Sequence, residues 1–145
     1  MTAALITGLV FTVFLLVITA YFLMGSVPLL ILKHDTPMDA RFVRAFYDTY
    51  YRMATACAGV TAVSYALAGR PLFASGAALL AISSALLRRQ FLPRMDALRA
   101  QIEGSDITAI PAFRRMHIVA ILMNVAQLVF IVWSLIAASM AMRRS

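Results

Sequence analysis

Four long stretches without a charged side chain restrict what this 145-residue chain can fold into. They run from Met1 to Leu32, from Met53 to Gly69, from Pro71 to Leu87 and from Met116 to Met142, where His117 is the only ionisable group. About 20 apolar residues cross a bilayer as a helix, and the two stretches of 17 residues lie at the short end of that range. With 63% hydrophobic and 13% charged residues, the chain has the composition of an integral membrane protein.

We therefore predict an all-α integral membrane protein with a single domain, an up-down bundle of four transmembrane helices. The predicted spans cover about residues 3–32, 46–69, 71–88 and 113–142. Glycine ends helices readily and proline is tolerated in a first turn, so Gly69-Arg70-Pro71 predicts a tight turn between the second and third spans. Because no Lys or Arg precedes Lys33, we expect the first span to be a retained helix rather than a cleaved signal peptide.

The segment between the third and fourth spans is amphipathic. Its apolar stripe has the spacing of a helix and consists of Phe91, Met95, Leu98 and Ile102. Gly104-Ser105-Asp106 breaks the pattern. We predict a separate amphipathic helix over residues 91–103 on the cytoplasmic side.

Basic residues are distributed unequally along the chain. Residues 33–52 and 88–115, which four spans place on one face of the membrane, hold ten of the 13 Lys and Arg residues and all six acidic residues. The positive-inside bias puts both segments in the cytoplasm, so we expect a multi-pass protein of the inner (plasma) membrane with both termini outside. The net charge of +7 is then a signal of topology, and we expect no nucleic-acid partner.

Small residues recur on the predicted spans. The second span has alanine at every fourth position and the third span repeats the pattern, at Ala54, Ala58, Ala62 and Ala66 and at Ala77, Ala81 and Ala85. Helices associate in lipid through such close-packing faces. We expect these faces to pack within the chain, with a homo-oligomer or a larger membrane complex as the alternative.

Three polar side chains mark one face of the fourth span. At 100° and 1.5 Å per residue, His117, Asn124 and Gln127 fall within an arc of about 80° and cover roughly 15 Å of depth. Polar groups on a membrane helix face the bundle interior, because lipid offers them no hydrogen bonds. This face predicts either the wall of a polar pocket open to the cytoplasm or hydrogen bonds that hold neighbouring helices together.

The chain has two histidines, and both belong to the predicted cytoplasmic end. His34 follows the first span and His117 precedes the core of the fourth. Two neutral imidazoles can ligate a haem iron or a single metal ion, so haem is one candidate cofactor. The alternative is a pair of ordinary interfacial histidines, because no third ligand stands at a diagnostic spacing. We predict no other metal site.

Aromatic and charged residues alternate at the start of the second span. The aromatic residues are Phe42, Phe46, Tyr47, Tyr50 and Tyr51, and the charged ones are Arg41, Arg44, Asp48 and Arg52. One interpretation is a site for an anionic headgroup or a carboxylate, which Arg guanidinium groups bind with paired donors. The other is an interfacial aromatic belt with snorkelling arginines.

The C-terminal half carries a recurrent pattern, which consists of Pro93, Leu98-Arg99, a polar connection, Phe113, His117 four residues later and Asn124 seven residues further. Over residues 91–135 the chain resembles small bacterial four-span membrane proteins of unknown function related to the anthrone-oxygenase-like group. Its general plan is also similar to that of HemJ-type protoporphyrinogen oxidases, although the first span has no histidine before His34. The resemblance implies four transmembrane helices and oxidation of a planar aromatic substrate near His117.

These observations lead to two hypotheses of function. In the first, the bundle binds a hydrophobic, planar ligand or cofactor near the cytoplasmic leaflet and acts as an oxidoreductase. His117 would then be the catalytic acid or base, and the ligand would be bound by Asn124, Gln127, Arg44, Arg115 and Tyr47. In the second, the chain is a non-catalytic accessory subunit that packs against a larger membrane complex.

Overall fold

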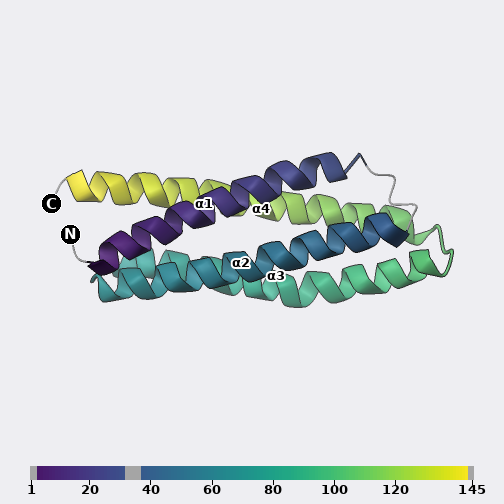
Figure 1. The fold of residues 1–145 in the computed structure, drawn as a ribbon, viewed down its shortest axis with the longest axis horizontal. Helices are drawn as coiled ribbons and strands as arrows, with labels where there is room; N and C mark the ends of the chain where they lie inside the picture. Colours follow the sequence, from purple (N-terminus) through teal and green to yellow (C-terminus); the bar gives the residue numbers. More distant parts are fainter. Residues whose placement is uncertain (1–2, 32–36, 144–145) are drawn as a thin grey trace.

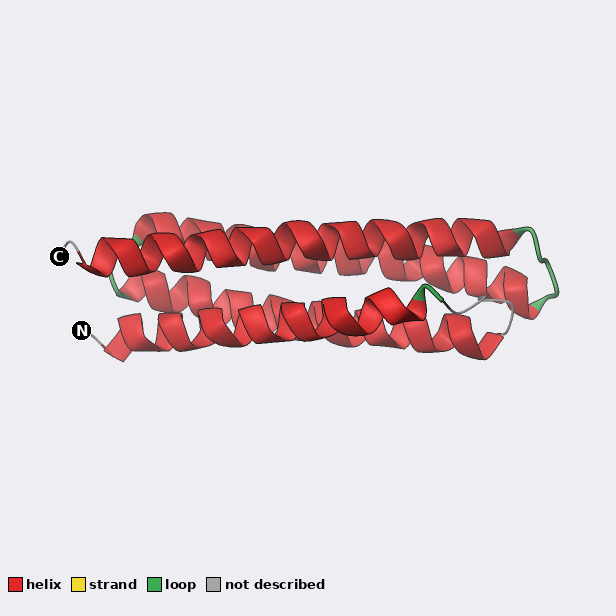
Figure 2. Cartoon of the chain, turned by 90° about the horizontal axis from the view of Figure 1, so that it is seen from above, coloured by secondary structure: helices red, strands yellow, loops and turns green. Residues whose placement is uncertain are grey.

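The protein is a bundle of four long antiparallel helices, as a computed structural model that describes residues 3–31 and 37–143 shows (Figure 1). The helices are α1 (Ala3–Leu29), α2 (Pro37–Leu67), α3 (Pro71–Glu103) and α4 (Ala109–Arg143). No strand occurs in these described ranges. The beginning of α1, the α2–α3 turn and the end of α4 lie at one end of the bundle, and the α3–α4 connection lies at the other (Figures 1 and 2).

Each helix packs against its neighbours around the bundle: α1 against α2, α2 against α3, α3 against α4 and α4 against α1. The α2–α3 contact is the most extensive, and the two contacts of α4 are the least extensive among these pairs. Because α2 and α3 are joined by a short turn, they form the tightly packed half of the molecule. The other half, formed by α1 and α4, is packed more loosely.

Three of the four helices, α1, α3 and α4, are long and apolar enough to cross a membrane. This finding confirms the prediction of an all-helical membrane protein. Helix α2 is not in this group, because its first 16 residues carry Asp39, Arg41, Arg44, Asp48 and Arg52. The predicted second span is therefore a helix that begins earlier, at Pro37, and has a charged half and an apolar half.

The separate helix that we predicted over residues 91–103 does not exist as such. This segment is the last part of α3, which runs without a break from Pro71 through Pro93 to Glu103. Its apolar stripe is buried at Leu92, Met95 and Ile102 and continues the buried face of the apolar half of α3. The amphipathic segment thus packs within the bundle. Its contact with α2 stabilises the helix beyond Pro93.

The two described connections are short and have local chemical causes. Gly69 adopts φ +68, a left-handed conformation that suits glycine, and Pro71 begins α3, as the sequence predicted. Before α4, the Asp106 carboxylate accepts hydrogen bonds from the backbone N–H and the hydroxyl of Thr108, at 3.0 and 2.5 Å. These hydrogen bonds lower the pKa of the Asp106 carboxyl below its ordinary value.

The interior face of α1 is made of small and polar residues. Thr12, Thr19 and Ser26, at seven-residue steps, are buried together with Gly8. Glycine at position 8 is needed for close approach, because an added Cβ would lie 3.1 Å from the ring of Tyr65. The Thr12 hydroxyl lies 3.0 Å from the Tyr65 hydroxyl, so a hydrogen bond joins α1 and α2 in addition to their packing contacts.

Candidate functional site: a polar cluster inside the bundle

Gln127 joins the helices through hydrogen bonds in the bundle interior. Its Oε1 accepts a hydrogen bond of 2.7 Å from the Tyr50 hydroxyl of α2, and its Nε2 donates to Ser84 Oγ of α3 at 3.1 Å. The Tyr50 hydroxyl also lies 3.4 Å from Thr19 Oγ1 of α1. All four helices thus contribute to one network. The geometry favours the structural interpretation of Gln127, because both ends of its amide are engaged with neighbouring helices.

Asn124, one helical turn before Gln127, is in a different situation. Its side chain is fully buried, and neither Oδ1 nor Nδ2 has a hydrogen-bond partner among the described residues. The Tyr51 hydroxyl likewise has no partner in the described part of the chain, and the hydroxyl of Tyr47, whose ring lies 6.0 Å from that of Tyr51, has only a weak interaction with Ser26 of α1. A buried polar group without a partner costs about 1–3 kcal/mol, so Asn124 and Tyr51 in one interior are a notable concentration.

Four buried polar residues, His117 and Asn124 of α4 and Tyr47 and Tyr51 of α2, lie in the bundle interior, and we call them the polar cluster. The His117 ring meets Tyr47 edge-on, with centroids 5.6 Å apart, on the side nearer the α3–α4 connection. The Gln127–Tyr50 hydrogen bond lies farther from that connection. Along α4, Asn124 falls between His117 and Gln127, and along α2, Tyr51 directly follows Tyr50. The sequence thus correctly indicated an interior polar face on α4.

His117 is completely enclosed, with no exposed side-chain surface. The other predicted haem ligand, His34, lies outside the described residues. No group of three or more His, Cys, Asp or Glu side chains in the described part of the chain can hold a metal ion. A haem ligated by His117 would have to displace packed side chains such as Tyr47, so the described interior does not fit this cofactor as folded.

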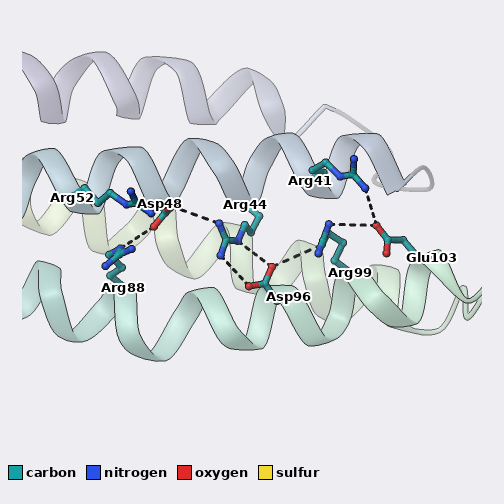
Figure 3. Close-up of polar contacts among 8 residues, drawn as sticks. All are labelled: Arg41, Arg44, Asp48, Arg52, Arg88, Asp96, Arg99 and Glu103. Atoms are coloured by element: carbon teal, nitrogen blue, oxygen red, sulfur yellow. Dashed lines mark hydrogen bonds and ion pairs between the residues drawn. The ribbon is translucent and has the colours of Figure 1, made fainter.

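Arg44, predicted to bind a ligand, is engaged in a ladder of ion pairs between α2 and α3 (Figure 3). Its Nε and Nη2 donate to the two carboxylate oxygens of Asp96, each at 3.0 Å. Asp48 accepts from Arg88 Nε at 2.8 Å and pairs with Arg52 Nη2 at 2.7 Å. We call this set the ion-pair ladder, which also contains the remaining members of Figure 3, Arg41, Arg99 and Glu103.

Arg115 is also separated from the polar cluster. It is exposed, and it precedes His117 by two residues, which turns its side chain about 200° away from that of the histidine. The structure therefore brings together Tyr47, His117, Asn124 and Gln127 from the predicted site. It places Arg44 and Arg115 on outer surfaces of the bundle.

Several residues of this interior were not assigned to the site from the sequence. Tyr50 and Tyr51 were assigned only to an aromatic group that was interpreted as either an anion site or an interfacial belt, and Ser84 was not singled out. The partners of Arg44 and Asp48 on α3 were missed as well. The seven-residue spacing of Thr12, Thr19 and Ser26 is the sequence signal that could have identified the buried polar face of α1. The pairing of helix faces depends on how the helices are rotated, which a linear pattern does not contain.

Comparison with known proteins adds no assignment, since this chain matches no family model, no curated protein and no solved structure. The site is therefore interpreted from its own geometry.

Proposed function

We propose that the polar cluster binds the polar end of a small hydrophobic molecule inside the membrane. The observation that carries this proposal is the amide of Asn124, which is fully buried and has unused donor and acceptor groups. In a membrane bundle such a group is costly, because neither water nor lipid satisfies it. A buried polar group that has no hydrogen-bond partner in the protein is typical of a binding site, where the ligand supplies the partner.

The chemistry of the cluster specifies the kind of molecule. The amide of Asn124 offers one donor site and one acceptor site, and the hydroxyls of Tyr47 and Tyr51 each offer both. A ring that carries carbonyl and hydroxyl groups, such as a quinone or a phenol, matches these groups and stacks against tyrosine rings. The His117 imidazole lies beside Tyr47, where it can take up or release a proton from such a ligand.

Entry of a ligand requires part of the bundle to move, because the cluster is enclosed. Helix α4 carries both Asn124 and His117 and has the least extensive contacts with its neighbours. We infer that α4 is the helix that moves, while the α2–α3 pair with its ion-pair ladder stays in place.

The proposal includes a topology in which α2 also crosses the membrane. Its apolar half, residues 53–67, lies beside the charge-free half of α3, and the two are joined by the turn at Gly69. With the arginine-rich end in the cytoplasm, the N- and C-terminal ends of the chain then lie outside the inner membrane. The segments 37–52 and 88–103 form the cytoplasmic extension of the bundle.

A short-chain quinone, decylubiquinone, is a suitable probe for this proposal. Purified wild-type protein should be stabilised in a saturable way as the quinone is added, which a thermal unfolding assay detects. The variant Asn124→Leu should lose this stabilisation. The matched control is Val125→Leu, since Val125 is the next residue and is exposed on the outer face of α4. Equal stabilisation of wild type and Asn124→Leu by the quinone would contradict the proposal.

The alternative, an accessory subunit, has support from a different surface. Tyr21, Met24 and Val27 of α1 are exposed, and their neighbour Phe22 packs against Phe46 of α2, at the level of the ion-pair ladder. Apolar side chains are thus exposed at the same height as charged ones. A partner protein that covers this face would explain it. This function predicts co-purification with a larger complex in mild detergent, and a solitary monodisperse chain would argue against it.

A further inference from the structure

A groove runs along the outer surface between α3 and α4, on a different side of the molecule from the ion-pair ladder. One section, of about 450 Å³, lies between Gly76, Leu79, Phe130 and Trp133. A second section, of about 320 Å³, continues from Leu79 and Phe130 toward Leu87 and Met123. The walls are almost entirely apolar, and both sections lie in the charge-free parts of the two helices.

The groove has the length of a lipid chain. On α4 it extends from Met123 to Ala137, which corresponds to about 21 Å of helix. Half of a bilayer core is about 15 Å thick, so one acyl chain from the cytoplasmic leaflet reaches beyond Phe130. Gln127 contributes to the wall, but its amide is hydrogen-bonded inward to Tyr50 and Ser84. The other polar wall residues are Ser75, Ser83 and Ser134, of which Ser75 and Ser83 donate to backbone carbonyls of α3.

Two arginines stand at the cytoplasmic mouth of this groove. Arg94 follows the groove residue Leu87 by seven positions, and Arg115 precedes the groove residue Ala126 by 11. Both steps return to the same helix face within about 20°, so both side chains originate on the groove side of their helices. Each arginine lies about 10–12 Å of helix beyond the nearest groove residue, Leu87 on α3 and Met123 on α4. They are thus at the same height, at the level of lipid headgroups.

Arg94 and Arg115 differ from the arginines of the ion-pair ladder in having no acidic neighbour. Both are exposed, and neither makes an ion pair or a side-chain hydrogen bond with any residue that the structure describes. Two uncompensated guanidinium groups attract an anion, and phosphate and carboxylate groups match the paired donors of arginine.

We propose that the α3–α4 groove binds a single anionic phospholipid from the cytoplasmic leaflet. Arg94 and Arg115 hold its phosphate, and one acyl chain lies along the groove toward Trp133. The fit rests on charge at the mouth and on apolar walls of matching length behind it. This site is independent of the interior polar cluster, and either proposal can fail without the other.

The single tryptophan of the chain, Trp133, makes the proposal testable in detergent solution, because it lines the groove. Lipids with brominated acyl chains quench a tryptophan that they contact. Brominated phosphatidylglycerol should quench Trp133 at about 25-fold lower concentration than brominated phosphatidylcholine, since each of the two arginines near an anionic headgroup contributes about fivefold.

Variants separate a defined site from general attraction to a basic protein. Arg94→Gln should weaken phosphatidylglycerol binding about fivefold, and Arg94→Gln with Arg115→Gln should remove the preference over phosphatidylcholine. Replacement of both arginines by lysine should retain most of the preference for phosphatidylglycerol. The matched control is Arg89→Gln, because Arg89 is exposed on the same helix but is turned about 200° from Leu87. Ala126→Phe, which fills the groove, should weaken both lipids while the arginines remain.

Three results would overturn the proposal. The first is equal quenching by phosphatidylglycerol and phosphatidylcholine in the wild type. The second is a loss of preference in Arg89→Gln as large as that in Arg94→Gln, which would indicate diffuse attraction. The third is unchanged quenching by both lipids in Ala126→Phe. Circular dichroism and gel filtration of each variant establish that it is folded.

Discussion

At the scale of single residues, the two side-chain amides of α4 are both buried but differ in their hydrogen bonds. Gln127 is bonded to α2 and α3, whereas Asn124, three residues earlier, is buried with its amide unused. The first contributes to the stability of the bundle. The second reduces it, which is the relation expected when a residue is present for function rather than for folding.

This contrast leads to opposite changes of stability for two similar substitutions. Asn124→Leu should raise the free energy of unfolding by about 1–2 kcal/mol, because it removes an unsatisfied buried amide and keeps the volume. Gln127→Leu should lower it by about 1 kcal/mol, because Tyr50 and Ser84 lose their shared partner. Thermal unfolding in one detergent measures both. A lower stability of Asn124→Leu would show that its amide has a partner in the protein.

At the scale of helices, α2 and α3 form the rigid unit of the bundle. Their charged halves are joined by the ion-pair ladder, in which Asp48 connects two arginines of α2 with one of α3. The Asp48 side chain is only 13% exposed, whereas that of Glu103, at the outer end of the ladder, is 36% exposed. Ion pairs shielded from solvent are more sensitive to the loss of one partner than exposed ones.

We therefore expect a graded response along the ladder. Asp48→Ala should destabilise the protein by about 2 kcal/mol, because two half-buried arginines, Arg44 and Arg88, lose their central carboxylate. Glu103→Ala should cost less than about 1 kcal/mol, because its pairs with Arg41 and Arg99 are exposed to solvent and salt. Unfolding monitored by circular dichroism at low and high salt measures the loss of stability in each of the two variants. Equal losses at both positions would contradict this account.

At the scale of the whole molecule, the arrangement of charge divides the bundle into two ends. The ion-pair ladder and the α3–α4 connection lie toward one end, and the α2–α3 turn lies at the other (Figures 1 and 3). The proposed topology places these ends on opposite sides of the membrane. It also places α2, which is not apolar enough over 18 residues to count as a span by itself, across the bilayer between its neighbours.

Labelling of single cysteines tests this topology. In a Cys57→Ala background, Arg70→Cys in the α2–α3 turn should react with a membrane-impermeant maleimide added to intact bacterial cells that express the protein. Ser105→Cys in the α3–α4 connection should react only after the membrane is permeabilised. The reverse pattern would place the arginine-rich end outside. Reaction of both cysteines in intact cells would rule out the proposed crossing of α3.

The sequence by itself was sufficient for the membrane environment, the helical class, the turn at Gly69 and the interior polar face of α4. These features depend on local composition and on the 3.6-residue period, which a linear pattern contains. The continuity of α3 through Pro93, the bonds of Gln127 and the pairing of Arg44 with Asp96 were decided only by the tertiary structure. Each depends on which faces of separate helices meet, and packing determines that choice, because lipid is nearly indifferent to how an apolar helix is rotated.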